Sequence, residues 1–541
     1  MSFTIPESNF SPVIIIGGGP SALAVSSRLC TTTSGAEYSD SEHNRFHWLR
    51  QRHNLDSSTG LFKPDDILIL DKIAPRFMAQ WGNQFEALGI KHLRSPMFFH
   101  PDPSDSDAMT AFAYANGRED ELMEIKGVVG RDPFKHQKGG RRGSTVEVDQ
   151  RNWTDFYRPG SQLFKDFCSF ISKRARLNNQ VKQCEVIDVK YGEICVVNEH
   201  DGRETKGIGF RVETVSGDVY GCGLCISAVG PSGTINYPIQ PDLDYRFPQG
   251  SCHSSHLFLK QVSFPPPGVV GAIASKKAEL IIVGGGLSSA QLAEKALMQG
   301  FSRVHFVTRG EIKVQHFDFG LEWVTKNKNI TKTEFWQHET DEERFDAAMK
   351  ARRGGSVNPQ YLDVLHDLEK KGRVVIYRNT EVVDKLWDEE NNRWARVTLH
   401  NKKDDTNTLL ANMNYVVYCT GSTPSLTTEP FLQSLLESHP IKSVRGLPCL
   451  TDDLQWSKDV PFFMIGRYAM LRTGPSSANL DGGRLGAERV GWKAQRMREM
   501  GELFLGKISE APNTKKGGMA ELLRCTGGQC NWYGVLNDVS A

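Results

Sequence analysis

Apolar residues gather in short runs along this chain, and stretches of mixed polarity separate them. The clearest runs are residues 13–16, 67–70, 280–283, 304–307 and 415–418. Short aliphatic runs that end near Gly, Asp or Thr are typical of buried strands in a parallel sheet. Two amphipathic helices are predicted over residues 341–353 and 359–371. The pattern therefore predicts an α/β protein.

Two of these runs lead directly into glycine clusters. The clusters are Gly17-Gly18-Gly19-Pro20-Ser21-Ala22 and Gly284-Gly285-Gly286-Leu287-Ser288-Ser289. In a dinucleotide-binding turn the first glycine permits the turn and the second lets the backbone approach a pyrophosphate. A third small residue lets the helix pack on the strand. Gly17, Gly19 and Ala22 meet these needs, and Pro20 suits a first helical turn whose N–H groups face phosphate. Two such turns predict two dinucleotides on one chain, an arrangement that serves hydride transfer between them.

The residue that ends the next strand distinguishes the two clusters. Asp71 ends the run 67–70, and an acid there binds ribose hydroxyls. It follows Gly19 by about 50 residues instead of about 20, so we interpret the polar segment 31–64 as a surface insertion. The run 304–307 ends in Thr308-Arg309, and an arginine there pairs with the 2′-phosphate of NADP. We therefore predict FAD at the first site and NADPH at the second.

Length and composition limit the function further. The chain has 541 residues, enough for two or three domains. Its net charge of +1 predicts no nucleic-acid partner. No segment has the pattern of a signal peptide or a membrane-spanning helix, and the 11 scattered cysteines favour a reduced, cytoplasmic protein. The sequence predicts no metal site and leaves open whether the chain forms a homo-oligomer.

The order of the motifs predicts two Rossmann-like dinucleotide-binding domains, with the NADPH domain inserted into the FAD domain. We place the first part of the FAD domain at residues 1–275 and the NADPH domain at 276–412. The second part of the FAD domain follows at 413–505, and residues 506–541 form an extension of unknown role.

The C-terminal part of the chain supplies further candidate cofactor contacts. A strand followed by a Thr-Gly turn at Gly421 marks the return to the FAD domain, and a later strand ends at Gly466. A helix is predicted to start near Asn479, Leu480 and Gly482, and its N-terminus would offer N–H groups and positive potential. These five residues join the predicted cofactor-binding set.

This order of motifs resembles the class B flavoprotein monooxygenases, most closely the N-hydroxylating branch with its ornithine and lysine hydroxylases and fungal relatives. The resemblance implies that the chain wraps over FAD at Gln80-Trp81. Ornithine hydroxylases carry a lysine that grips the amino-acid carboxylate, whereas residues 92–101 here contain no lysine and are richer in aromatic residues. Within that segment, His92 and Arg94 are candidate flavin-side residues.

The resemblance also implies the reaction. NADPH would reduce FAD, O₂ would form a flavin C4a-(hydro)peroxide, and a heteroatom of a small-molecule substrate, nitrogen in preference to sulfur, would take up the distal oxygen. Such chemistry needs a dry pocket more than acid–base side chains, so we name no catalytic residue. The aromatic segment indicates a flat substrate, such as an indole alkaloid of secondary metabolism.

Three alternatives remain open. A disulfide oxidoreductase would use the CxxC pair Cys222 and Cys225, or Cys525 and Cys530 near the C-terminus. A non-catalytic regulator could keep the flavoprotein scaffold without turnover, although both glycine clusters are intact. An NADPH oxidase would differ from a monooxygenase only in releasing peroxide, and the sequence does not reveal whether peroxide is released.

Overall fold

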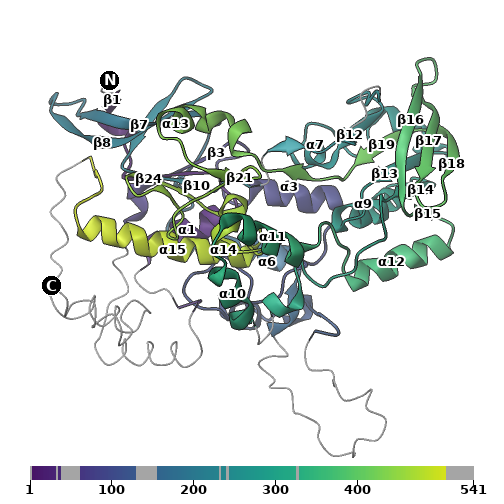
Figure 1. Ribbon diagram of the computed structural model, residues 1–541, viewed down its shortest axis with the longest axis horizontal. Helices are drawn as coiled ribbons and strands as arrows, with labels where there is room; N and C mark the ends of the chain where they lie inside the picture. The colour runs from purple at the N-terminus through teal and green to yellow at the C-terminus, as the bar shows by residue number, and fades with distance from the viewer. Residues whose placement is uncertain are drawn as a thin grey trace, which may run out of the picture.

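The computed structural model describes residues 3–31, 35–37, 61–128, 155–230, 233–238, 243–324 and 328–506. Almost all of the extension predicted at 506–541 and most of the insertion predicted at 31–64 lie outside these ranges. The described chain forms two mainly parallel sheets that lie beside each other along the long axis of the molecule, each with helices against it (Figure 1). The predicted α/β fold with two Rossmann-like units is confirmed.

The first sheet is built around the first apolar run of the sequence. Its strand order is β23-β24-β10-β2-β3-β6. The bounds are β2 Val13–Ile16, β3 Ile67–Asp71, β6 Val181–Gln183, β10 Leu224–Ser227, β23 Gln455–Ser457 and β24 Val460–Met464. All four residues of β2 are buried, because parallel strands flank it on both sides. We call this sheet and the elements packed on it the first unit.

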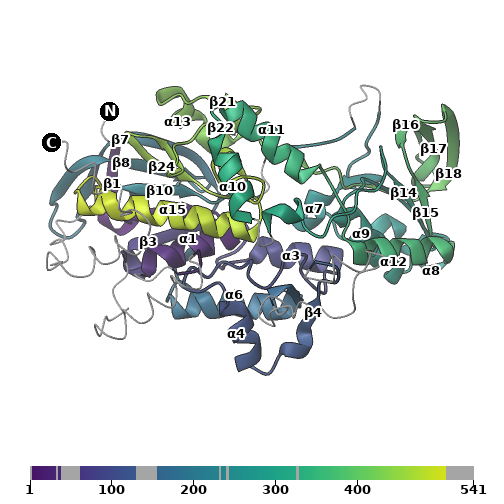
Figure 2. The ribbon, with the colours of Figure 1, turned by 60° about the horizontal axis from the view of Figure 1, so that its bottom comes forward.

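Two helices from opposite ends of the chain pack together in the first unit. Helix α1 spans Pro20–Cys30 and helix α15 spans Leu480–Glu499. Figure 2 shows α15 lying along α1. Arg28 of α1 forms an ion pair with Glu488 of α15 at 2.6 Å. The contact brings the beginning of α15 close to the first glycine cluster.

The second sheet has five parallel strands in the order β12-β19-β13-β14-β15. The bounds are β12 Ser251–His253, β13 Glu279–Val283, β14 Arg303–Val307, β15 Val374–Tyr377 and β19 Tyr415–Tyr418. Side chains alternate between the two faces of a strand. Leu280 and Ile282 therefore join the core under helix α9 (Leu287–Met298), while Ile281 joins a separate core under an antiparallel sheet. We call this sheet and the elements packed on it the second unit.

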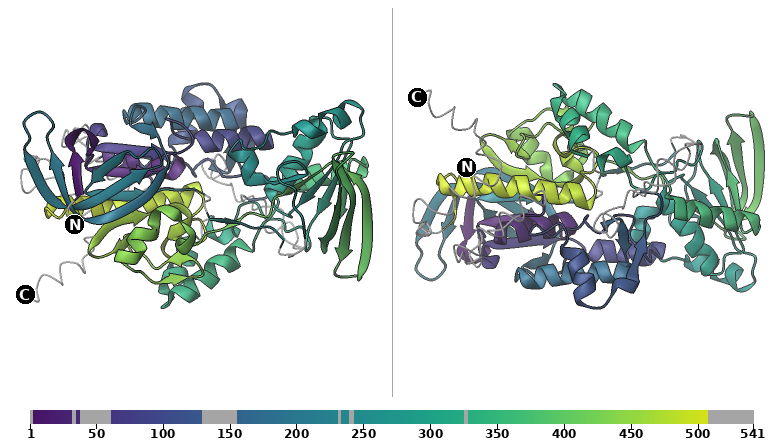
Figure 3. Two further views of the ribbon diagram at one scale, coloured as in Figure 1. Left: turned by 90° about the horizontal axis from the view of Figure 1, so that it is seen from above. Right: turned by 90° about the horizontal axis from the view of Figure 1, so that it is seen from below.

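The antiparallel sheet of the second unit forms one end of the molecule (Figure 3). Its strands are β16 Thr380–Asp388, β17 Arg393–Asn401 and β18 Thr406–Met413. A mixed sheet, in the order β1-β7-β8-β9, lies at the opposite end, with β1 parallel to β7 and the other pairs antiparallel. The bounds are β1 Phe3–Pro6, β7 Val186–Val197, β8 Glu204–Thr214 and β9 Val219–Cys222.

The structure also contains the following helices and short strands. Helices of the first unit and its neighbourhood are α3 Ala79–Leu88, α4 Ala108–Ala115, α6 Ser161–Arg174, α13 Gln433–Ser438 and α14 Met470–Thr473. Helices α7 Ser254–Phe258 and α8 Val270–Ala274 lie before β13, and the short strands β4 Leu122–Glu124 and β5 Tyr157–Pro159 pair with each other. Within the described ranges, no helix is both long and apolar enough to cross a membrane.

Two chain segments connect the units, and they pair with each other. Strand β11 (Thr234–Ile235) runs antiparallel to β20 (Ser422–Thr423). The N–H of Asn236 donates to the carbonyl of Gly421 at 3.0 Å. Gly421 has a φ of 75°, in the left-handed region that glycine tolerates without strain. The predicted Thr-Gly turn therefore lies in the connection between the two units.

The crossover from β14 to β15 makes an excursion into the first unit. It contains helices α10 (Lys328–Gln337) and α11 (Asp341–Arg352) before helix α12 (Pro359–Lys370) returns to the second sheet. Phe317, Trp323 and Phe335 on this excursion belong to the core of the first unit. The helices predicted over 341–353 and 359–371 are confirmed by α11 and α12, whereas the sequence pattern did not predict that part of the crossover would leave its own sheet.

Candidate functional site

The first glycine cluster forms the turn between β2 and α1. Gly17 has a φ of 107°, and a Cβ atom placed on it would lie 2.7 Å from the carbonyl oxygen of Ala228. A side chain at this position is therefore excluded. A Cβ atom on Gly19 would meet nothing within 4 Å. Gly19 is also the N-cap of α1 and gives the first N–H groups no side-chain acceptor. This turn therefore presents open space and unsatisfied donors at a helix N-terminus, as a pyrophosphate site requires.

Pro20, Ser21 and Ala22 form the first turn of α1, where the C-terminal helix approaches. A Cβ atom on Gly483 would lie 2.8 Å from Oγ of Ser21, and one on Gly466 would lie 3.5 Å from the same atom. Ala22 is fully buried against the sheet, as the third small residue of the motif should be. The predicted contacts of the first site therefore come from both ends of the chain.

Asp71 lies next to the first glycine turn in spite of its long sequence separation. One carboxylate oxygen accepts from the N–H of Gly18 at 2.7 Å, and the other accepts from Ile73 at 2.8 Å and Ala74 at 3.1 Å. The proximity follows from the pairing of β3 with β2, which places the ends of both strands at one sheet edge. The long separation between Gly19 and Asp71 in the sequence therefore does not prevent their contact, because the insertion leaves the strand pairing unchanged.

Helix α3 begins directly after the segment that follows Asp71. The N–H of Met78 donates to the carbonyl of Gly18 at 2.8 Å, so the chain folds back over the first turn. Gln80 faces the turn after β10, because a Cβ atom on Gly230 would lie 4.0 Å from its Oε1. Trp81 packs on Phe164 of α6 with ring centres 5.8 Å apart. Gln80 and Trp81 thus both lie on α3, the helix that covers the first glycine turn.

The beginning of α15 supplies the remaining predicted residues of the first site. Asn479 is the N-cap, and its side-chain oxygen accepts from the N–H of Leu480 at 2.6 Å. Leu480 is buried, and a Cβ atom on Gly482 would lie 2.3 Å from the carbonyl oxygen of Ser476. Gly482 therefore lets the preceding loop pack against the first turn of α15.

The second glycine cluster forms the turn between β13 and α9. Gly284 has a φ of 143°, and a Cβ atom on it would lie 2.4 Å from the carbonyl oxygen of Cys419. Gly286 is the uncapped N-cap of α9, which begins at Leu287 and Ser288, and Ser289 is buried beneath it. A Cβ atom on Gly286 would lie 3.8 Å from Cα of Gly355. The backbone of Gly355 therefore covers this turn, whereas the first turn is open.

Arg309 follows β14 at the edge of the second sheet. The side chain is exposed, and it makes no hydrogen bond or ion pair with the part of the chain that the structure describes. Thr308 beside it is buried against the glycine turn, since a Cβ atom on Gly285 would lie 2.5 Å from its Oγ1. Arg309 is therefore placed at the strand end where the sequence predicts a phosphate contact, and its guanidinium is available for one.

His92 and Arg94 lie on a loop where the two units meet. His92 pairs with Gly160 in an isolated bridge, and burial together with the charge of Arg158 lowers its pKa below the usual value. Arg94 donates to Asp318 at 2.7 Å and to backbone carbonyls of the excursion. The guanidinium of Arg94 is therefore engaged in hydrogen bonds and an ion pair with the second unit.

Arg158 is a residue that the sequence reasoning did not single out. Arg158 on β5 is only 8% exposed, and among the described residues its Nε has no hydrogen-bond partner. Burial lowers its pKa, and its charge acts on His92, on His316 and on Tyr361 of α12. A buried guanidinium N–H group without an acceptor is costly, and an anion that binds there would remove this cost. Its only signal in the sequence is an arginine before a proline, which is too weak to predict a site.

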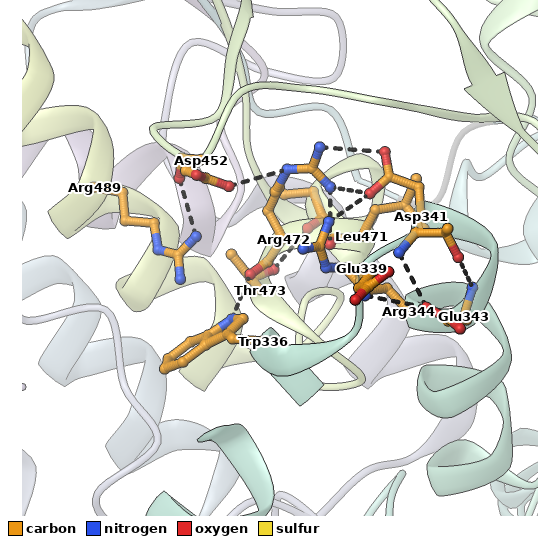
Figure 4. A network of polar contacts seen from close by, with 12 residues as sticks. Trp336, Glu339, Asp341, Glu343, Arg344, Asp452, Leu471, Arg472, Thr473 and Arg489 are labelled. Carbon is orange, nitrogen blue, oxygen red and sulfur yellow. Dashed lines mark hydrogen bonds and ion pairs between the residues drawn. The ribbon is translucent and has the colours of Figure 1, made fainter. Parts of the chain in front are cut away.

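A second polar network joins the excursion to the first unit through Arg472. Figure 4 shows Arg472 of α14 facing Asp341 at the start of α11, with Nη2 and Oδ2 3.2 Å apart. The indole N–H of Trp336 donates to the carbonyl of Arg472 at 3.1 Å. The contacts that hold the excursion to the first unit therefore include those of Arg94 and, separately, those of Arg472.

The cysteines give little support to thiol chemistry. Cys222 and Cys225 are both fully buried, and burial together with a hydrogen bond to Cys225 raises the pKa of the Cys222 thiol well above its usual value. The nine cysteines in the described ranges are all free thiols. Cys525 and Cys530 lie outside the described residues. A redox-active pair requires an accessible thiolate, and the CxxC pair does not provide one.

The architecture is similar to that of solved monooxygenases over almost the whole chain. The ornithine N-hydroxylase of Kutzneria sp. 744 has a TM-score of 0.58 and 14% identity, covering 90% of this chain and 100% of its own. The FAD-bound cadaverine monooxygenase of Erwinia amylovora has a TM-score of 0.56 and 14% identity, covering 94% and 100%. L-lysine 6-monooxygenase of Pseudomonas syringae has a TM-score of 0.54 and 16% identity, covering 90% and 99%. The sequence matches no family model and no curated protein. These likenesses establish a shared fold.

Proposed function

We propose that this protein is an NADPH- and O₂-dependent flavin monooxygenase that hydroxylates a nitrogen atom of a small molecule in the cytoplasm. The observation that carries the proposal is the pair of glycine turns, each at the end of a parallel strand and each leading into a helix without a side-chain cap. The shared fold supports it, because the ornithine N-hydroxylase was solved with reduced FAD, NADP⁺ and L-ornithine.

FAD fits the first turn. Its pyrophosphate would occupy the open space at Gly19, and Asp71 beside Gly18 would accept from the ribose hydroxyls. Gln80 and Trp81 cover the turn from one side. The start of α15 would offer positive potential to the flavin ring from the other side.

NADPH fits the second turn and the strand end beside it. Arg309 would pair with the 2′-phosphate, since a planar guanidinium binds phosphate in a bidentate manner. Arg158 lies between the units with an unsatisfied Nε, so it would hold a further anionic group of the nucleotide. When bound, FAD would supply the hydride and oxygen chemistry, while the residues of this chain bind, orient and exclude water.

The segment after Arg94 is aromatic, with Phe98 half-buried and Phe99 in the hydrophobic core. Phe98 packs on Phe99 and on Phe156 with ring centres 4.9 and 5.4 Å apart. Phe99 also lies 6.3 Å from both Phe317 and Phe319 of the excursion. Because Arg94 is already paired with Asp318, it is not free to grip an amino-acid carboxylate. We therefore propose a flat nitrogen compound, such as an indole alkaloid of secondary metabolism, as the substrate.

The experiment that tests this function follows the flavin spectrum of the purified protein. We expect FAD to copurify, NADPH to bleach its absorbance without oxygen, and NADH to do so much more weakly. Mixing the reduced protein with O₂ should produce a transient near-ultraviolet band before the oxidised spectrum returns. Direct reoxidation without that band would favour an oxidase. Failure of NADPH to reduce the flavin would contradict the proposal and favour a scaffold without turnover.

A further inference from the structure

The excursion begins and ends in two chain segments that lie side by side, and together we call them the neck. We define the neck as Gln315–Asp318 on the outgoing segment and Ser356 on the returning one. The two segments pair next to the neck, where the N–H of Gln315 donates to the carbonyl of Val357 at 3.0 Å and that of Val357 donates to Lys313 at 2.8 Å. The returning segment is also the one that brings Gly355 over the second glycine turn. The position of the neck therefore affects both the excursion and the nucleotide site.

One side chain of the first unit holds both segments of this neck. Nε of Arg94 donates to the carbonyl of His316 at 2.9 Å, and Nη2 donates to the carbonyls of Gln315 at 2.8 Å and Phe317 at 2.6 Å. Nη2 also donates to Oγ of Ser356 at 2.9 Å. All of these acceptors belong to the neck, so the whole guanidinium fork is used to grip the second unit.

The contact continues from the neck to the beginning of α15. Nη1 of Arg94 pairs with Oδ1 of Asp318 at 2.7 Å, and Oδ2 of Asp318 accepts from the amide of Asn479 at 3.3 Å. Burial raises the pKa of Asp318, but the attraction of Arg94 and Arg352 outweighs it and holds this pKa below the usual value. The carboxylate is thus charged at neutral pH. An uninterrupted set of polar contacts joins the first unit, the neck and the N-cap of α15.

Only an arginine satisfies this arrangement. Its planar fork reaches several acceptors at fixed angles, whereas a lysine offers a single charged point. The side chain of Arg94 is 11% exposed. Removing it would take away the guanidinium donor of these carbonyl groups and would leave the Asp318 carboxylate with the Asn479 amide but without its ion-pair partner. The residue therefore determines where the neck lies relative to the first unit.

We propose that Arg94 is a positioning residue that sets the second nucleotide site at its working distance from the first. It acts through the neck on the segment that covers Gly286, and through Asp318 and Asn479 on the helix start at the first site. The inference rests on the proposed function, because the distance matters only if hydride passes from one nucleotide to the other. Such a transfer loses about 100-fold in rate for a displacement of about 1 Å.

The test measures flavin reduction by NADPH in the holoprotein under anaerobic conditions. The variants are Arg94→Met, which removes every contact, Arg94→Lys, which keeps the charge, and Asp318→Asn, which keeps the backbone contacts. We expect the limiting reduction rate to fall about 100-fold in Arg94→Met and about tenfold in the two milder variants. The dissociation constants of FAD and NADPH should change by less than about threefold. If Arg94→Met does not fold, the milder variants carry the test.

The matched control is Arg472→Met. Arg472 also joins the excursion to the first unit through an aspartate, Asp341, and none of its hydrogen bonds or ion pairs with the described residues reaches the neck (Figure 4). We expect a similar loss of thermal stability with an unchanged reduction rate. A rate that falls equally in the Arg472 and Arg94 variants would overturn the inference. The loss would then come from a weaker attachment of the excursion in general and not from the neck.

The outcomes also separate this inference from the proposed function. If the wild-type protein is reduced by NADPH and the Arg94 variants are reduced at the same rate, the positioning role is wrong and the function stands. If the variants lose NADPH affinity in proportion to rate, Arg94 contributes to binding and the positioning role is wrong. If NADPH does not reduce the wild-type flavin, both proposals fail together.

Discussion

The two glycine turns have nearly the same local sequence but different surroundings. In both, the first glycine adopts a positive φ and lies against the backbone of a neighbouring strand end. The second glycine differs, since Gly19 faces open space and Gly286 faces the backbone of Gly355. The first turn is completed by α15 of its own unit, whereas the second is covered by a segment that Arg94 holds from the other unit. The motif thus specifies the turn, while the access to it depends on distant segments.

The strand ends beside the two turns show the same contrast. Asp71 is engaged by three backbone N–H groups and is fixed in place before any nucleotide binds. Arg309 is exposed and makes no hydrogen bond or ion pair within the described chain. We infer that the first site is preorganised, and that the second site completes its contacts when its nucleotide arrives. Preorganised groups lose less entropy on binding, so the first nucleotide should be held more tightly.

The largest expected effect comes from the first turn itself. Gly17→Val places a branched side chain at a φ of 107° and against the carbonyl of Ala228. We expect the unfolding free energy to fall by about 3 kcal/mol or more and FAD to be lost. Gly19→Ala is the matched control, because the added methyl group enters open space and should change stability by less than about 0.5 kcal/mol. Equal losses in denaturant unfolding would contradict the comparison.

A pH effect is expected from a buried lysine of the second unit. Lys385 on β16 is buried among Tyr245, Trp394 and Tyr418, and burial lowers its pKa to about 7. The unfolded chain therefore binds the proton more tightly, and the folded state loses stability as the pH falls from about 10.5 to about 7. Lys385→Met should remove this slope, a difference on the order of 3 kcal/mol between pH 7 and pH 10.

Denaturant unfolding at the two pH values measures the Lys385 effect. The matched control is Lys206→Met on β8 of the first unit, where the side chain is 73% exposed. This control should keep the pH dependence of the wild-type protein. The same pH dependence in the wild-type protein and in Lys385→Met would show that Lys385 is charged in the folded state.

A smaller effect is expected at the exposed strand end. Arg309→Ala should raise the dissociation constant of NADPH about tenfold and leave that of NADH unchanged, because only NADPH carries the 2′-phosphate. Thermal stability should stay the same, since the side chain makes no hydrogen bond or ion pair within the described chain. Titration of both nucleotides measures this difference. Equal weakening of both would place Arg309 away from the 2′-phosphate.

The smallest effect is expected at the CxxC pair. Cys222→Ala and Cys225→Ala, alone or together, should leave the rate of flavin reduction by NADPH and the reoxidation by O₂ unchanged, because both thiols are buried. Each substitution should lower the free energy of unfolding, because it removes a buried sulfur atom. A rate that falls only in the double variant would instead support disulfide chemistry.

Much of the candidate site was predictable because its signals are local. A glycine at a positive φ, an aliphatic strand before it and a proline at the first helical position are requirements of a single turn. Asp71 could be predicted in spite of the insertion because strand pairing, rather than loop length, brings it to Gly18. Arg158 could not be predicted, since its importance comes from burial without a partner, which sequence does not record.

The fold class, the two glycine turns and the contrast between Asp71 and Arg309 followed from the residue order, because each depends on the chemistry of a few neighbouring positions. The excursion of α10 and α11 into the first unit, the covering of Gly286 and the grip of Arg94 on the neck became visible only in the folded chain. Each of these depends on which distant surfaces bury each other. Many loop paths between β14 and β15 satisfy the same local preferences, and only packing against the first unit selects one of them.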